Sequence, residues 1–266
     1  MAKQEKKPTT PVVKPFLTGK ITDERTKTGA LSFFGIMLMA VVMTFLVSSV
    51  MNMGSDVLRA VVCMAVELLV LFIFYNTAVG KGTDAVARGE ILYQRQEKGL
   101  PFSESERAVC FHPGKGYVTA LLGTLPFLIC GIILAIIAHR QTTAVGALPT
   151  WISNYQRRGE IGDALVAYQS AGGLGLEDIL RIIVRIAVMP FVSLVGGENR
   201  DGLLLVERLS PVLLLLPALA YGTGYLQGRS ERTRIHTGIA ENNRRRARKE
   251  RKARKVRAAK GPEQLN

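Results

Sequence analysis

Cysteine and histidine are scarce in this sequence, with three of each among 266 residues. Cys63, Cys110 and Cys130 have no CxxC spacing and no pairing pattern, so we expect no disulfide framework. The histidines are scattered, and none has a second ligand at metal-binding spacing. The composition therefore argues against a disulfide-stapled secreted domain, and it predicts neither a metal site nor a bound cofactor.

Common enzyme signatures are also missing. The segment Gly114-Lys115-Gly116 lacks the GxxxxGK[ST] frame of a phosphate-binding loop. The sequence contains no HExxH motif and no GxSxG motif. We therefore expect that the protein is not an enzyme, and no catalytic residue is assigned. An intramembrane enzyme with an unrecognised site is the least favoured alternative.

Charge is absent from several long stretches, although the chain carries 35 Lys and Arg against 21 Asp and Glu and is 48% hydrophobic. A bilayer core of about 30 Å needs roughly 20 apolar residues in a helix. Because lipid offers no hydrogen bonds, each crossing segment must satisfy its own backbone and is therefore helical. The four predicted spans are residues 30–54, 57–79, 116–138 and 203–226.

The expected fold is therefore all-α, a polytopic helical membrane protein with a membrane domain at residues 29–228. A cytoplasmic loop at 80–115 and an outer segment at 139–202 connect the spans. Within the outer segment, Leu176–Gly197 is apolar but carries Arg181 and Arg185, and its uncharged part is only about a dozen residues long. We predict an outer interfacial or re-entrant helix there, with five spans as the alternative.

The distribution of positive charge predicts the orientation. Residues 1–28 hold seven Lys and Arg, the loop at 81–115 holds six, and the tail from Gln227 holds fourteen, whereas residues 139–176 hold three. Positively charged flanks stay in the cytoplasm. Both basic termini, 1–28 and 229–266, are therefore predicted to be cytoplasmic. Two termini on the same side require an even number of spans. We interpret the membrane as the plasma membrane.

The cytoplasmic loop contains local helix signals. Ser103 followed by Glu106 matches a capping box, which predicts a short helix from Glu104 to about Phe111. His112-Pro113-Gly114 should end it before the third span. A separate second helix is expected over residues 83–98.

Glu67 is the most informative single residue, because it lies in the middle of the second span. A carboxylate at that depth is costly and should face the bundle interior and find a partner or a proton. We interpret it as a possible contact for a substrate, an ion or a proton. The alternative is a structural glutamate bonded to Ser48, Ser49 or Asn52, or to an arginine of the outer segment.

Arg181 and Arg185 could contact an anionic substrate or a lipid headgroup. The favoured alternative is that they extend to the membrane surface or pair with Glu177 and Asp178. The neighbouring charges Glu207-Arg208, beside the last span, are expected to pair with each other.

The tail is a block of like charge, which is normally a solvated and mobile interaction segment. It could bind anionic lipid headgroups or RNA phosphate, and the remaining alternative is that it only fixes topology. No aromatic residue interrupts the charges, so base stacking is not expected. The predicted phosphate contacts are Arg244, Arg245, Arg246, Arg248, Lys249, Arg251, Lys252, Arg254 and Lys255.

Two functions fit these features. The first is a transport-related protein, either a small permease or the membrane subunit of a transporter, because of Glu67 and of prolines within the third and fourth spans. The second is a non-catalytic membrane scaffold or biogenesis factor whose tail binds anionic lipid, RNA or a ribosome. Besides the lipid bilayer, a protein partner or a homo-oligomer fits either function. Gly123 and Gly131 should allow close helix packing.

Overall fold

The computed structural model describes residues 11–50, 56–139, 175–196 and 199–259, and within these ranges the chain is helical and contains no strand. The predicted outer segment lies largely at 140–174, outside the described residues, as do the outermost residues of both termini. The described helices are α1 Glu24–Val50, α2 Asp56–Glu97, α3 Glu104–Ala108, α4 Lys115–Ile137, α7 Leu176–Ala187, α8 Met189–Val195 and α9 Arg200–Ala259.

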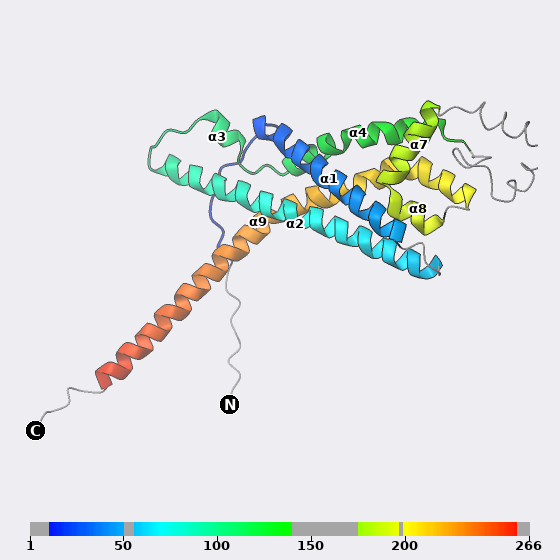
Figure 1. Ribbon diagram of the computed structural model, residues 1–266. Helices are drawn as coiled ribbons and strands as arrows, with labels where there is room; N and C mark the ends of the chain where they lie inside the picture. The colour runs from blue at the N-terminus through cyan, green and yellow to red at the C-terminus, as the bar shows by residue number, and fades with distance from the viewer. Residues whose placement is uncertain (1–10, 51–55, 140–174, 197–198, 260–266) are drawn as a thin grey trace, which may run out of the picture.

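Four of these helices, α1, α2, α4 and α9, are long and apolar enough to cross a membrane. They form one bundle, in which α9 packs along both α2 and α4 (Figure 1). The core contains Phe33, Phe74, Leu134, Leu214 and Tyr221, all of which are almost fully buried. The all-α prediction and the four apolar helices are confirmed.

The outward faces of the four long helices are apolar as well. Leu68, Leu69 and Phe72 form such a face on α2, and Ile132 and Ile136 form one on α4. Exposed apolar surface of this extent is unusual in a soluble monomer and is what lipid would cover. The bundle therefore has the surface of a membrane protein.

The prediction of a separate helix over residues 83–98 is wrong, because α2 runs without a break from the apolar region to Glu97. Gly82 does not end the helix; it allows α2 to lie close to α9. A Cβ at Gly82 would lie 2.3 Å from the Tyr225 carbonyl oxygen, and one at Gly228 would lie 2.5 Å from the Gly82 carbonyl carbon. The two glycines thus let the backbones of α2 and α9 touch where both helices leave the apolar region.

The predicted packing role of Gly123 and Gly131 on α4 is confirmed. A Cβ at Gly123 would lie 2.7 Å from the Ala30 carbonyl oxygen of α1, and one at Gly131 would lie 2.9 Å from Leu214 of α9. Helix α4 can therefore approach α1 at one glycine and α9 at the other.

The outer element consists of two short helices, α7 and α8, separated by a break at Val188. With 12 and 7 residues, neither is long enough to span a bilayer. Helix α7 packs mainly on α4, and α8 packs on α2 and α1 (Figure 1). At its far end, α8 is held by Arg59, whose Nε donates to the Ser193 carbonyl oxygen at 3.1 Å.

The N-terminal segment before α1 crosses the opposite end of the bundle from α7 and α8. The backbone N–H of Val12 donates to Thr237 Oγ1 on α9, that of Leu17 to the Gly89 carbonyl on α2, and that of Gly19 to the Phe111 carbonyl. Residues 11–22 therefore hold the polar ends of α2 and α9 against the connection before α4. The distribution of charge in the sequence did not predict these contacts.

The predicted capping box is present. The Glu106 N–H donates to Ser103 Oγ at 3.2 Å, and the Ser103 N–H donates to Glu106 Oε2 at 3.0 Å. Helix α3 begins at the predicted residue but ends at Ala108, three residues earlier than expected. His112 to Gly114 then form the turn that leads into α4.

Candidate functional site

Glu67 faces the bundle interior, as predicted. It lies near the centre of the apolar part of α2, and only 8% of the residue is exposed. Among the described residues, no side chain forms an ion pair or hydrogen bond with it. The side chains of the expected partners Ser48, Ser49 and Asn52 lie outside the described part of the structure.

A small cavity of about 30 Å³ lies against Glu67. That volume is enough for one water molecule. Helices α1, α2, α7, α8 and α9 meet around it, and Val188, at the break between α7 and α8, and Pro190 of α8 line it. The other lining residues are Met37, Ala40, Val41, Thr44, Val70, Phe74, Ala187, Phe191, Leu213, Leu214 and Pro217. The outer element therefore reaches the depth of Glu67, and we call this space the Glu67 cavity.

Three aromatic rings close the bundle on the side of the cavity toward the polar ends of α2 and α9. The Phe33 ring lies 4.9 Å from that of Phe74 and 5.2 Å from that of Tyr221, measured between centroids. All three side chains are almost completely buried. Phe74 lines the Glu67 cavity, so this group, which we call the aromatic plug, forms one wall of it.

A second cavity, of about 270 Å³, lies beyond the aromatic plug, where the helices leave the apolar region. Tyr221 forms part of its wall, and Arg25, Lys81 and Arg88 line it together with Lys115. We call it the basic pocket. The aromatic plug therefore separates a small acidic cavity within the apolar region from a larger basic pocket at its edge.

The Lys115 ammonium group of the basic pocket is already neutralised. Its Nζ donates to Asp23 Oδ2 at 2.9 Å and to the Ala108 carbonyl at 2.7 Å. Burial alone would raise the pKa of Asp23, but hydrogen bonds from Thr26 and Lys115 outweigh it and hold this pKa below its ordinary value. The pair fixes the start of α1 to the start of α4.

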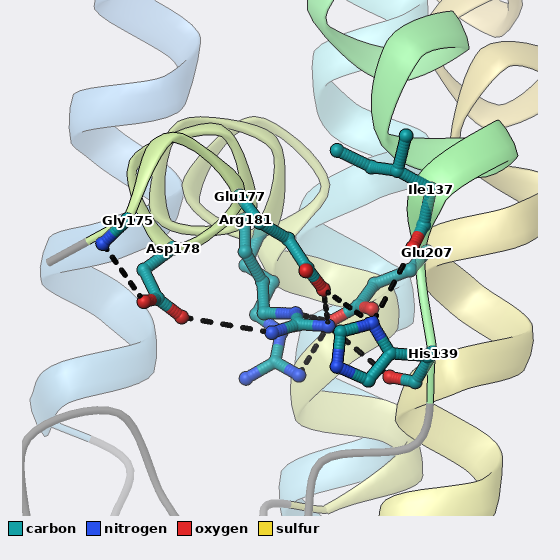
Figure 2. Close-up of polar contacts among 8 residues, drawn as sticks. Ile137, His139, Gly175, Glu177, Asp178, Arg181 and Glu207 are labelled. Carbon is teal, nitrogen blue, oxygen red and sulfur yellow. Dashed lines mark hydrogen bonds and ion pairs between the residues drawn. The ribbon is translucent and has the colours of Figure 1, made fainter. Parts of the chain in front are cut away.

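Arg181 and Arg185 converge on Glu207 of α9. Figure 2 shows Arg181 beside Glu207. Arg185 Nε donates to Glu207 Oε1 at 2.8 Å. Arg181 Nε lies 3.0 Å from the same oxygen without hydrogen-bond alignment, so that contact is an ion pair only. Arg181 also donates to Glu177 and to the His139 carbonyl at the end of α4.

Two predictions about these charges need correction. Glu207 does not pair with its neighbour Arg208 but with both arginines of α7, because it lies on the face of α9 that packs toward that helix. Arg181 does not extend to the surface, since only 2% of it is exposed, although it does contact Glu177 and Asp178 as expected. The cluster joins α7, α4 and α9, and both arginines have carboxylate partners there.

A further buried cluster was not predicted from the sequence. Glu90 on α2 accepts hydrogen bonds from Arg232 Nε and Nη2 at 3.1 and 2.8 Å, and its other oxygen lies 2.7 Å from His236 Nε2. Burial alone would raise the pKa of Glu90, but the bonds from Arg232 and His236 lower it. Only the crossing of α2 and α9 brings these residues together, so no local sequence signal could reveal the cluster.

The basic tail is the continuation of α9, which runs as one helix to Ala259. This C-terminal part of α9 projects away from the bundle (Figure 1). The predicted phosphate contacts, residues 244–246, 248, 249, 251, 252, 254 and 255, are all exposed. Arg245 donates to Glu241 one turn earlier. We expected a mobile tail, but in the described residues the tail is a helical arm. Alanine and long charged side chains favour helix, which accounts for this difference.

Comparisons with protein-family models, with curated proteins and with solved structures find no match to this chain. Among the described residues, no three His, Cys, Asp or Glu side chains gather closely enough to hold a metal ion.

Proposed function

We propose that the protein is transport-related, either a small permease or the membrane subunit of a larger transporter, with Glu67 as its proton or cation contact. The proposal depends on one observation: a buried carboxyl group in the apolar centre of the bundle that has no partner among the described residues. An isolated buried carboxylate is strongly disfavoured, so it requires a proton or a cation.

The surroundings of Glu67 support this function. The break between α7 and α8 and the prolines Pro190 and Pro217 line its cavity. Irregular backbone at membrane depth is tolerated where it lines a cavity. The aromatic plug separates this cavity from the basic pocket, as a closed gate would between a central site and one side of the membrane.

In this proposal, the chain crosses the plasma membrane four times with both termini in the cytoplasm. The hydrogen bonds of residues 11–22 support this arrangement, since they tie the N-terminal segment to α9 beyond its apolar part. The basic pocket would then face the cytoplasm, and α7 and α8 would lie in the outer half of the bilayer.

Proton flux into liposomes containing the purified chain tests the proposal. Under a potassium diffusion potential, wild-type protein should acidify the lumen faster than empty liposomes do, and Glu67→Gln should abolish the difference. Glu97→Gln is the matched control, because it makes the same change at an exposed position of the same helix. Equal rates for wild type and Glu67→Gln would remove the basis of the proposal.

A second candidate function is a membrane scaffold whose helical arm holds an anionic partner. The supporting observation is that every described cation between Arg244 and Lys255 is exposed. Phosphate contacts of this kind weaken steeply with salt. Deleting residues 241–266 should release bound anionic lipid, RNA or ribosomes at physiological salt, and recovery that depends on neither deletion nor salt would contradict it.

A further inference from the structure

We infer that the basic pocket binds a phosphate ester, most simply the phosphate of an anionic lipid headgroup, between α1 and α2. The inference is independent of the transport proposal, because it rests on Arg25, Lys81 and Arg88 and not on Glu67.

The three side chains supply positive charge that the described part of the protein does not neutralise. No described carboxylate lies within ion-pair distance of Arg25, Lys81 or Arg88. Among the described residues that line the pocket, Asp84 is the one carboxylate besides Asp23, and Asp23 is already bound to Lys115. Three uncommitted cations against one uncommitted carboxylate leave an excess of two positive charges around the pocket.

The pocket is also concave and has a firm wall. Its volume of about 270 Å³ is close to the lower end of ligand sites, roughly 300 Å³. Tyr221 and Tyr225, both buried, form one side of it, and Gly116 lets Tyr225 approach α4, since a Cβ there would lie 2.5 Å from Tyr225 Cβ. The cations therefore line a preformed space.

The basic pocket lies at the edge of the apolar region, which is the depth at which lipid phosphate groups lie in a bilayer. Gly29 immediately precedes the first apolar run, and Lys81 follows the second by two residues. Lys81 Nζ lies 3.4 Å from Ser32 Oγ, and Ser32 and its neighbour Leu31 are exposed on the apolar outer face of α1. An anion beside Lys81 would therefore have room for an acyl chain along α1.

These three side-chain types suit a phosphate in particular. Arginine guanidinium groups form paired hydrogen bonds to phosphate oxygens, and a lysine adds a point charge. Arg25 comes from the start of α1, whereas Lys81 and Arg88 lie two turns apart on α2. A phosphate held by all three would join two helices that otherwise make few contacts with each other.

The test measures the unfolding temperature of the full chain in detergent with added phosphatidylglycerol, phosphatidylcholine or glycerol 3-phosphate. Phosphatidylglycerol should raise it, because a ligand of the native state stabilises that state. The variant Arg25→Gln/Lys81→Gln/Arg88→Gln should need about a hundredfold more of this lipid, at roughly fivefold per cation removed. Lys14→Gln/Lys98→Gln/Arg107→Gln removes the same charge from exposed positions outside the pocket and should respond like wild type.

The two sources of phosphate are separated by the soluble compound. Stabilisation by phosphatidylglycerol alone assigns the site to lipid, and equal stabilisation by glycerol 3-phosphate assigns it to free phosphate esters. The inference is overturned if neither compound stabilises wild type, if phosphatidylcholine acts as strongly as phosphatidylglycerol, or if the pocket variant responds like wild type.

A second measurement covers the case in which the pocket variant does not fold. Acetylation of Lys81 in the wild-type protein, followed by mass spectrometry, should slow at least about fivefold with phosphatidylglycerol and stay unchanged with phosphatidylcholine. Lys98 on the same loop, exposed and outside the pocket, is the internal control. Unprotected Lys81 would overturn the inference.

Discussion

Glu67 and Glu207 are two glutamates buried in the same helical bundle, with 8% and 1% of their surface exposed. Glu67 lies against a water-sized cavity without a charged partner among the described residues, whereas Glu207 contacts both Arg181 and Arg185. The contrast shows that burial alone does not identify a functional carboxyl group. A paired carboxylate fastens helices together, and an unpaired one is available to a ligand.

The largest expected effect is on stability at Glu207. Glu207→Gln should lower the free energy of unfolding by about 3–5 kcal/mol, because it leaves buried arginine charge without its central partner. Thermal unfolding of the purified protein in detergent, followed by circular dichroism, measures the change. A loss below 1 kcal/mol would mean that Glu177 and Asp178 can neutralise both arginines, and the contrast with Glu67 would weaken.

The two arginines should contribute unequally. The Arg181 side chain is 3% exposed and that of Arg185 is 23% exposed. Arg181→Met should therefore cost about 3 kcal/mol, and Arg185→Met about 1 kcal/mol, since solvent screens the more exposed charge. The same unfolding assay ranks them, and a reversed order would show that Arg185 is the main partner of Glu207.

Glu90 extends the comparison to a paired glutamate outside the apolar region. Its pKa is lower in the folded protein than its ordinary value of 4.5, so its stabilisation is complete above about pH 4.5 and is lost as the pH falls through the folded pKa. Glu90→Gln should cost about 1.5–3 kcal/mol at pH 7, the usual range for hydrogen bonds to a charged group. Unfolding temperatures from pH 7 to pH 3.5 should show the gap to wild type narrowing, while exposed Glu97→Gln shows no such change.

The smallest stability effect is expected at Glu67 itself. Glu67→Gln should change the free energy of unfolding by less than about 1 kcal/mol, because no described partner is lost and a glutamine has nearly the same shape. The same purified samples used for Glu207→Gln provide the measurement. A loss as large as that at Glu207 would reveal a partner for Glu67 and would end the distinction between the two residues.

Much of the fold could be predicted because membrane helices follow from local composition. The apolar runs gave the four long helices, and Ser103 with Glu106 gave the start of α3. The continuity of α2 through Gly82 could not be predicted, because an isolated glycine with a lysine beside it also marks the end of a span. The position of Glu67 toward the bundle interior was predicted from its depth, but its lack of a partner among the described residues was not.

The sequence by itself determined which segments are apolar, that they are helical, and that one glutamate lies at the centre of a span, because these properties depend on neighbouring residues and on the chemistry of lipid. Only the tertiary structure decided that Arg181 and Arg185 meet Glu207, that Glu90 meets Arg232 and His236, and that Arg25, Lys81 and Arg88 surround one pocket. These residues are far apart in the chain, and their meeting depends on how the helices cross, which side-chain packing and close glycine contacts set.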